Sequence, residues 1–374
     1  MHLHICRLRL VTILGVLVLC SCNTTPPPVP GEGTSNSVEA KAAQPTLTPS
    51  PIYLTADLRC TNYIETQWGT GLGDLGLCPV SSDAWIRGPY PPKLNAQGDL
   101  FIVDKANQRI LRYSGGVASQ VIPIPSSYVL DDVCGYANRW SNVSVSKDRL
   151  FFRYSVWQDE RIVDRLAVLS LDGQEERIID LELYYPLHSI RLDSLIADRR
   201  GGVYVRLPPA GVVHFDTDLR PEFRYLGSEA SYEDLVVGWD GNLYTYSAER
   251  DHLTNWGAGK KRFTGPVEPL SWMANVIDAT PIISPTYTRL LGADTQGRLY
   301  FRTCERGVDV WLMRVSASGD QRVIAAVPEG WPSPSTLAPD GSLYSITYDP
   351  TDLSVRPRVV RCVFDQDQAL TPTP

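Results

Sequence analysis

The stretch LNAQGDLFIVDKANQRILRY, residues 94–113, carries the pattern on which the fold prediction depends. Gln97 and Gly98 precede the apolar run LFIV, and the run RILRY follows a few residues later. Glycine adopts the positive φ that tight turns need, and branched and aromatic residues favour strands. Residues 94–113 are therefore predicted to form short strands joined by tight turns.

The same pattern returns five more times along the chain. The later copies occupy residues 143–156, 195–207, 235–247, 290–303 and 336–348. With Gly98 as the first turn residue, the others are Asp148, Gly201, Gly241, Gly297 and Gly341. Their separations are 50, 53, 40, 56 and 44 residues, close to the length of a four-stranded propeller blade.

These repeats predict an all-β chain whose blades pack radially, because one blade cannot bury both of its faces alone. We expect a β-propeller of six blades over residues 52–366 and a polar C-terminal tail over residues 367–374. An open β-sandwich is the alternative, but its strands would not recur at a regular spacing along the sequence. No helical pattern interrupts the series.

The first copy resembles the NHL repeat, a family of β-propeller sequences. That pattern has a glycine turn, a strand ending in an aspartate, then Asn, Arg-Ile and an aromatic residue. Here those positions are Gly98, Val103, Asp104, Asn107, Arg109, Ile110 and Tyr113. The other copies keep the turn and the aromatic strand but lack the Asp-x-x-Asn-x-Arg stretch, so they resemble the family only loosely.

The last copy lacks a fourth strand, and the segment at residues 52–70 is its expected donor. If this segment closes the ring, Cys60 falls beside Cys362 in one blade, and this pair is the first disulfide candidate. A loop between Cys60 and Cys78 is the rival, because connectivity cannot be read from sequence.

Residues 1–21 resemble a bacterial lipoprotein signal peptide. Arg7 and Arg9 precede an uncharged apolar run at residues 10–19, which is too short to span a bilayer. Cys22 follows the small residue Ser21 and is the expected site of lipidation, with palmitate among the acyl groups. An ordinary secretory signal or an uncleaved anchor is the alternative.

Residues 22–51 are rich in Pro, Thr and Ser and are expected to form an extended tether. Together with the signal, this tether predicts an extracytoplasmic monomer held at the bacterial cell membrane by lipid on Cys22. The chain has 35 Lys and Arg against 42 Asp and Glu, a net charge of −7, and its basic residues are scattered. A nucleic-acid partner is therefore not expected.

No known catalytic motif or metal-binding motif stands out. His188, His214 and His252 remain after cleavage of the signal and are expected to be packing or solvated residues rather than zinc ligands. Asp172 and Asp240, like Asp340, occur in Asp-Gly turns without the remaining ligands of a calcium loop. The sequence predicts no catalytic residue, no metal site and no cofactor.

Arginine and aromatic residues recur just before the innermost strand of several predicted blades, where they would approach the mouth of the channel. Guanidinium groups bind carboxylates, and aromatic faces supply contact area. Singly solvated loop residues are the alternative. The candidate ligand-binding residues are Arg87, Arg139, Trp140, Arg191, Tyr232, Tyr287 and Arg289.

Three functions remain open from the sequence. The first hypothesis is a binding or scaffold propeller without catalytic activity that presents one face to a protein, peptide or glycan. The second is a channel-metal enzyme of the lactonase or lyase type, which would hold calcium or zinc. The third is a sugar-binding protein that uses its nine tryptophans.

Overall fold

The computed structural model describes residues 52–78, 88–125, 143–159, 161–184, 195–207, 211–225, 234–247, 252–257, 263–266, 288–304, 310–349, 352 and 354–369. Backbone contacts divide the chain into Met1–Thr48 and Pro49–Pro374, and every described residue belongs to the second unit. The predicted signal peptide and tether therefore lie outside the described residues. Among the described residues, no helix is long and apolar enough to cross a membrane.

The described residues form an almost purely β structure, which confirms the all-β part of the predicted fold class. The one helical element among them is a short 3-10 helix, η3 (Leu181–Tyr184). Branched and aromatic residues fill the strands, as in β3 (Leu100–Asp104), which reads LFIVD and is buried throughout.

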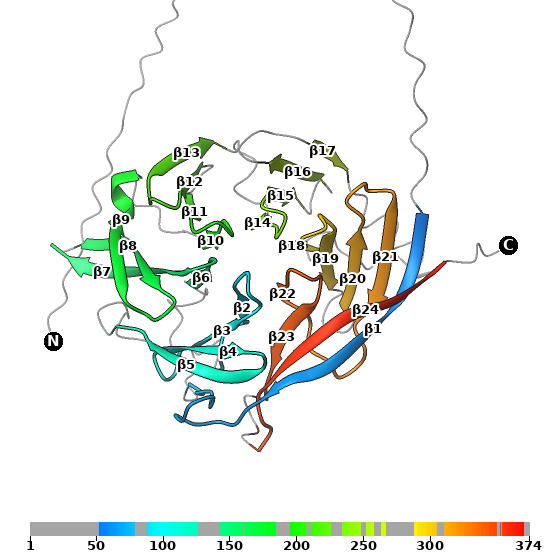
Figure 1. Cartoon of the computed structure of the whole chain (residues 1–374), viewed down its shortest axis with the longest axis horizontal. Coiled ribbons are helices and arrows are strands. Elements are labelled where there is room, and N and C mark those ends of the chain that lie inside the picture. Colours follow the sequence, from blue (N-terminus) through cyan, green and yellow to red (C-terminus); the bar gives the residue numbers. More distant parts are fainter. Residues whose placement is uncertain are drawn as a thin grey trace, which may run out of the picture. The chain divides into compact units, whose positions relative to one another are not determined.

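Four antiparallel sheets each contain four consecutive strands (Figure 1). The first sheet is β2 (Lys93–Leu94), β3, β4 (Arg109–Ser114) and β5 (Val117–Pro123). The second is β6 (Val143–Val145), β7 (Arg149–Gln158), β8 (Arg161–Ser170) and β9 (Glu175–Asp180). The third is β10 (Leu195–Ala197), β11 (Val203–Leu207), β12 (Gly211–Phe215) and β13 (Pro221–Tyr225). The fourth is β14 (Asp234–Val237), β15 (Leu243–Ser247), β16 (His252–Gly257) and β17 (Phe263–Pro266).

A fifth sheet has eight strands in the order β18-β19-β20-β21-β1-β24-β23-β22. It contains β18 (Arg289–Ala293), β19 (Leu299–Cys304), β20 (Val310–Val315), β21 (Gln321–Ala326), β22 (Thr336–Leu337), β23 (Leu343–Thr347) and β24 (Arg358–Ala369). The N-terminal strand β1 (Ile52–Glu65) pairs antiparallel with β24 and, at its start, parallel with β21. The N-terminal segment thus lies in the sheet that contains the C-terminal strand.

The first strand of each meander faces the centre of the unit (Figure 1). Contacts join β2 to β6, β6 to β10, β10 to β14, β14 to β18 and β18 to β22. The circle is completed where Thr336 Oγ1 donates a hydrogen bond to Pro92 O at 2.7 Å. This radial arrangement of meanders is the architecture of a β-propeller.

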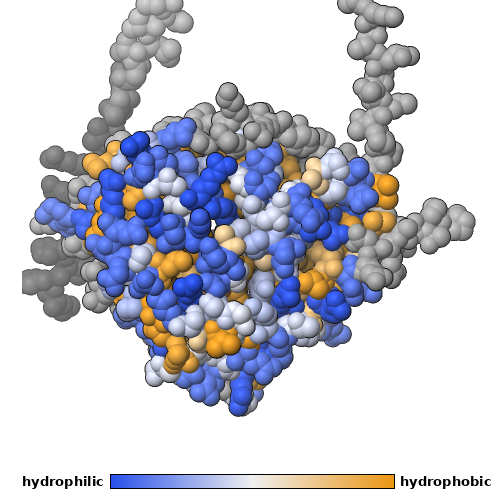
Figure 2. All heavy atoms as spheres, viewed as in Figure 1, coloured by the Kyte–Doolittle hydropathy of each residue, from blue (hydrophilic) through white to orange (hydrophobic). Residues whose placement is uncertain are grey.

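The hydrophobic core lies between neighbouring sheets rather than inside any one of them. One cluster joins Phe101 of β3 to Leu150 of β7, and another joins Tyr246 of β15 to Phe301 of β19. The last two rings meet edge to face at 5.1 Å. On the face seen in Figure 2, hydrophilic residues predominate and hydrophobic ones are scattered.

The turn glycines adopt the conformation that the repeat requires. Gly98, Gly241, Gly297 and Gly341 have φ between 75° and 87°, and Gly201 has φ of 114°. Each leads from a first strand into a second strand. Asp148 is not among the positive-φ residues, since its turn is a shorter one in which Ser146 N donates to Arg149 O at 2.9 Å.

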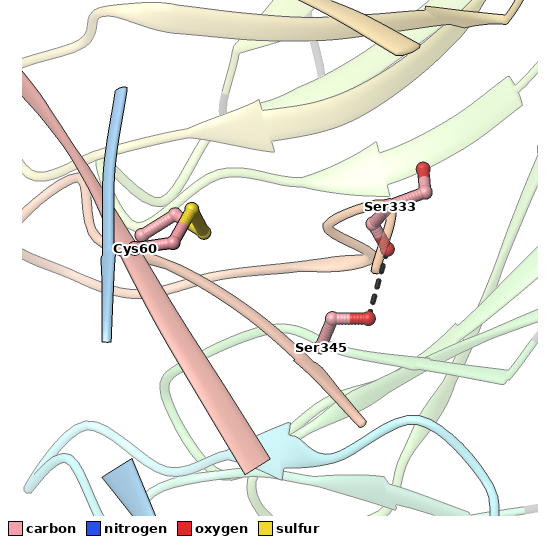
Figure 3. The surroundings of a disulfide bond; sticks show 4 residues. Cys60, Ser333 and Ser345 are labelled. Carbon is pink, nitrogen blue, oxygen red and sulfur yellow. Dashed lines mark hydrogen bonds between the residues drawn. A yellow bond between two sulfur atoms is a disulfide. The ribbon is translucent and has the colours of Figure 1, made fainter. Parts of the chain in front are cut away.

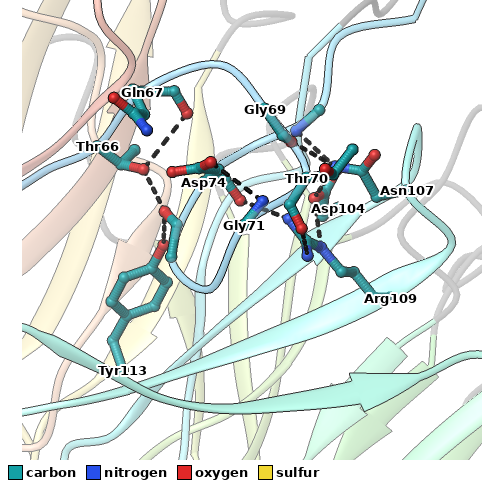
Figure 4. A network of polar contacts seen from close by, with 12 residues as sticks. Thr66, Gln67, Gly69, Thr70, Gly71, Asp74, Asp104, Asn107, Arg109 and Tyr113 are labelled. Atoms are coloured by element: carbon teal, nitrogen blue, oxygen red, sulfur yellow. Dashed lines mark hydrogen bonds and ion pairs between the residues drawn. The ribbon is translucent and has the colours of Figure 1, made fainter.

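The residues that carry the NHL resemblance clamp the glycine-rich loop at residues 69–74 (Figure 4). Asp104 accepts hydrogen bonds from Arg109 Nε at 2.9 Å and from Asn107 Nδ2 at 2.7 Å. Arg109 in turn donates to Thr70 O at 2.6 Å and to Asp74 O at 2.8 Å. The Asp-x-x-Asn-x-Arg stretch therefore has a structural role in the first sheet.

A disulfide joins Cys60 of β1 to Cys362 of β24 (Figure 3). This bond is the first of the two candidate pairings predicted from the sequence. The two residues are direct partners in the strand register. Cys78 is also disulfide-bonded, so the rival Cys60–Cys78 pairing is not formed. Near the Cys60–Cys362 bond, Ser345 Oγ donates to Ser333 O at 2.8 Å and fastens the segment before β22 to β23.

Candidate active site in the central channel

A cavity of about 240 Å³ lies where the first strands meet. Its walls come from β2, β6, β10, β14, β18 and β22, together with residues that flank these strands. Most of the lining is aliphatic, with Leu94, Val145, Ile196, Val237, Leu290 and Leu337 contributed by different strands. An apolar cavity with few polar groups is the usual form of a small-molecule site.

Two basic side chains, Lys93 and Arg199, line this cavity. Lys93 begins β2, and Arg199 lies in the turn between β10 and β11. The lining residues that the structure describes include no Asp, Glu, His or Cys. The cavity therefore combines an apolar wall with positive charge and no acidic counterpart from those residues.

The guanidinium of Arg199 lies over an aromatic ring. Its Cζ is 3.7 Å from the centroid of the Trp239 ring, a distance at which cation–π attraction is favourable. Arg199 Nη1 donates a long hydrogen bond, 3.5 Å, to Leu94 O, while Nε is buried without a hydrogen-bond partner. Arg199 thus has donor capacity left over inside the cavity.

Trp239 is itself held in place by two other strands. Its Nε1 donates to Leu337 O at 2.8 Å, and its backbone N donates to Ala293 O at 2.7 Å. Leu337 belongs to β22 and Ala293 to β18. The ring beneath Arg199 is therefore a fixed surface, tied to two strands besides the one that precedes it.

The backbone of Arg199 has φ of 66°, in the left-handed region that residues with a Cβ rarely adopt. Local hydrogen bonds impose this turn, since Asp198 Oδ1 accepts from Arg200 N at 2.8 Å and from Gly202 N at 2.7 Å. Asp198 Oδ2 is occupied as well, by His214 Nε2 at 2.8 Å. The carboxylate next to Arg199 in sequence is therefore fully engaged elsewhere.

Burial shifts the pKa values of both basic groups downward. Burial is the main reason that the pKa of Lys93 is lowered, and the positive charge of Arg199 adds to the effect. Burial also lowers the pKa of Arg199 to about 10, although the negative charge of Asp198 acts against this. Both shifts indicate that the charged forms are poorly solvated in the channel.

The sequence candidates fall mostly outside the described residues, namely Arg87, Arg139, Trp140, Arg191, Tyr232 and Tyr287. Arg289 is described, and its Nη1 lies 3.1 Å from Asp234 Oδ1. Leu290 N also donates to Asp234, at 3.0 Å, so this contact ties β18 to β14. The role of Arg289 in ligand binding stays a prediction.

The histidines and Asp-Gly turns have structural partners wherever their side chains are described. His214 stacks on Tyr204, with ring centroids 4.3 Å apart, and contacts Asp198. Asp240 accepts hydrogen bonds from Tyr244 OH at 2.5 Å and from Asn242. His188 and the side chain of His252 lie outside the described residues.

None of Lys93, Arg199 and Trp239 was predicted from the sequence as a site residue, although a signal for the first of them was present. Lys93 stands five residues before its turn glycine, where the other glycine-turn copies have Ile196, Val236, Gly292 and Thr336. A single lysine among apolar or small residues at a repeated inner-strand position indicates a channel-facing charge. Arg199 carried a weaker sequence signal, because charged residues are common in turns.

No protein-family model and no curated protein matches the chain. Among solved structures, a streptogramin B lyase has 11% identity and a TM-score of 0.43, over 83% of this chain and 98% of that one. A gluconolactonase from Xanthomonas campestris has 13% identity and a TM-score of 0.44, over 84% and 95%. A regucalcin from Agrobacterium tumefaciens, described as a calcium-binding protein, has 12% identity and a TM-score of 0.41, over 83% and 98%.

These findings correct the first functional hypothesis, that of a scaffold without catalytic activity. Several of the structures that the chain resembles are named as enzymes, among them a lyase, a gluconolactonase and a luciferin-regenerating enzyme. The non-catalytic hypothesis is not carried further. The alternative is a lactonase or lyase type of activity.

Proposed function

We propose that the chain is an extracytoplasmic, lipid-anchored enzyme of the lactonase or lyase type, with its active site in the central channel. The observation that carries this proposal is the amine of Lys93 in a mainly aliphatic cavity that no described acidic residue lines. A lysine in such surroundings can be neutral at a pH where an exposed lysine is charged, and a neutral amine can accept a proton.

The same proton transfer serves either reaction. In lactone hydrolysis, Lys93 takes a proton from water as the water oxygen bonds to the carbonyl carbon. The ring C–O bond then breaks, and the released oxygen takes the proton back from the Lys93 ammonium. In a lyase reaction, Lys93 takes a proton from carbon, the C–O bond one carbon away breaks, and the departing oxygen receives that proton.

The proposal includes six blades closed by the N-terminal strand. Support comes from the order of the eight-stranded sheet, in which β18 to β21 form one meander and β22 to β24 another. The second meander has three strands of its own, and β1 pairs along it as the fourth. Counted in this way, the eight-stranded sheet supplies the fifth and sixth blades.

The proposed anchor is lipid on Cys22, after removal of residues 1–21, with residues 22–51 as the tether. It rests on the basic residues, apolar run and Ser-Cys pair in the sequence. We expect Cys22→Ser to release the protein from the membrane fraction of a bacterial host, whereas Cys20→Ser leaves it membrane-bound. Equal release by both variants would point to an ordinary secretory signal.

Calcium or zinc does not fit the described part of this channel. Calcium needs several oxygen ligands and zinc needs Cys, His or carboxylate ligands. The described lining offers Lys93 and Arg199 instead, and the described residues contain no cluster of three potential metal ligands. We therefore derive no step of the proposed reaction through a metal.

The enzyme proposal is tested by turnover on a panel of aldonolactones and aromatic lactones, with a lyase assay on cyclic esters that carry an acidic C–H bond. We expect turnover by the native protein and a loss of about 100-fold or more in kcat for Lys93→Met, which keeps an unbranched chain as far as Cε but lacks the amine. Lys147→Met is the matched control, because Lys147 is exposed in the turn between β6 and β7.

Two results would count against the enzyme proposal. Absence of turnover with a folded native protein on the whole panel would contradict the activity itself. Full activity in Lys93→Met would contradict the role of the amine. Product analysis distinguishes the two reactions, because hydrolysis incorporates one oxygen from labelled water and elimination leaves a carbon–carbon double bond.

A further inference from the structure

We propose that the channel recognises a carboxylate on an otherwise apolar small molecule, and that Arg199, stacked on Trp239, is the residue that binds it. The inference names the substrate class for the site, and so it rests on the proposed function for its catalytic meaning. Binding, however, can be measured without turnover.

Among the described residues, Arg199 has no partner anion. Neither it nor Lys93 forms an ion pair with a described residue, and the neighbouring carboxylate of Asp198 is directed to His214 and to two backbone N–H groups. Nε of Arg199 is buried with no hydrogen-bond partner. A buried donor left unsatisfied is costly, and an anion that accepted its hydrogen bond would remove that cost.

The geometry of the stack also favours a carboxylate. With Cζ 3.7 Å from the ring centroid, the guanidinium lies over Trp239, and the edge that carries Nε has a donor without a hydrogen-bond partner. That edge presents parallel donors that match the two oxygens of a carboxylate. Because Trp239 is hydrogen-bonded to β22 and contacts β18 through its backbone, the platform does not have to be ordered on binding.

The strained backbone of Arg199 indicates that this position is specified by its surroundings. Among the described residues, only Gln108, Asp159 and Leu219 are other non-glycine residues with positive φ. The equivalent positions, two residues before the other turn glycines, carry no charge and hold Ala96, Trp239, Thr295 and Pro339. Unusual backbone conformations persist where the fold imposes them and often occur at binding sites.

The rest of the ligand is expected to be apolar and small. The walls beyond the two basic residues are mainly aliphatic, with Ser144, Ser335 and Thr336 as the hydroxyl-bearing exceptions. The Ser144 hydroxyl already accepts a hydrogen bond from Ala197 N at 2.8 Å, and Thr336 donates to Pro92 O. A polyol would therefore find few free partners, whereas a planar or aliphatic acid would fill a cavity of about 240 Å³.

The test compares benzoate with benzamide, a neutral molecule of the same shape, by saturation-transfer NMR and calorimetry on the full mature chain. We expect benzoate to bind at least about tenfold more tightly than benzamide, as a charge-assisted hydrogen bond predicts. Arg199→Asn should abolish that preference, and Asn is chosen because it tolerates positive φ. The matched control is Arg200→Asn, which removes an exposed arginine from the same turn.

A second variant keeps the test decisive if Arg199→Asn fails to fold. Trp239→Leu removes the aromatic platform but leaves the arginine, and it should weaken benzoate binding while benzamide binding stays unchanged. Equal affinity for benzoate and benzamide in the native protein would overturn the inference, as would an unchanged preference in a folded Arg199→Asn. Arg199-dependent binding of benzoate without any turnover would leave the inference standing and contradict the proposed function.

Discussion

Lys93 should make the stability of the protein depend on pH, because its pKa is lowered in the folded state. Its pKa is lowered because burial and the charge of Arg199 disfavour the ammonium form, whereas an unfolded chain has the ordinary value of 10.5. Between the lowered pKa and 10.5 the unfolded state binds more protons, so stability is lost as pH falls through this window. Below the lowered pKa the loss is complete and constant.

We therefore expect Lys93→Met to be more stable than the native protein at pH 7, and this advantage to shrink as pH is raised toward 10. Methionine keeps an unbranched side chain as far as Cε and removes the group that must be desolvated. Urea unfolding at a series of pH values measures the difference. Lys147→Met, at an exposed position, should show no such trend, and a pH-independent difference for Lys93→Met would contradict the assigned cause.

At the scale of elements, the clamp between the first sheet and residues 69–74 is predicted to hold the segment that follows β1. The Arg109–Asp104 pair is almost fully buried, with side-chain exposures of 9% and 0%. Arg109→Met leaves the aspartate buried without its cation and frees two backbone carbonyls. We expect a loss of roughly 3–5 kcal/mol in the free energy of unfolding.

Hydrogen exchange distinguishes this local effect from general destabilisation. Amides at residues 69–74 should exchange faster in Arg109→Met under conditions where β15 and β19 stay protected. The control is Arg59→Met, because Arg59 and Asp365 form an ion pair at 3.8 Å with exposures of 66% and 43%. Exposed pairs contribute less than about 1 kcal/mol. Comparable losses of unfolding free energy in the two variants would therefore show that the Arg109–Asp104 pair contributes no more than an exposed ion pair.

At the scale of the whole molecule, the Cys60–Cys362 disulfide joins two strands that are 302 residues apart in sequence. Such a bond restricts the unfolded chain over nearly its whole described length. We expect Cys60→Ser with Cys362→Ser to lower the free energy of unfolding by about 2–5 kcal/mol. Chemical denaturation of the purified protein under non-reducing conditions measures this loss.

The single substitutions provide the control for the disulfide. Each serine variant breaks the same bond, so the two single losses and the double loss should be about equal rather than additive. Losses that add would mean that the cysteines contribute separately through packing. The expected equality also tests the register of β1 on β24, in which Cys60 faces Cys362.

Much of the fold could be predicted from sequence, because strands and tight turns depend on residues that are close along the chain. The glycine turns and apolar runs of residues 94–113 and their copies mark most first and second strands, and the missing fourth strand indicated a donor at residues 52–70. The fourth strands themselves were not predicted. β9, which reads EERIID, is polar at its start and mostly exposed, so it lacks a strong apolar pattern.

The sequence by itself determined the repeated turns and the all-β class, because local backbone preferences decide where tight turns and strands form. It also determined a short list of cysteine pairings, because the missing fourth strand of the last copy suggested where Cys60 lies. Only the tertiary structure decided that Lys93, Arg199 and Trp239 share one cavity. These residues belong to three different repeats, and none forms a motif with its neighbours in sequence. Radial packing of the first strands brings them together, and burial there gives ordinary side chains their altered chemistry.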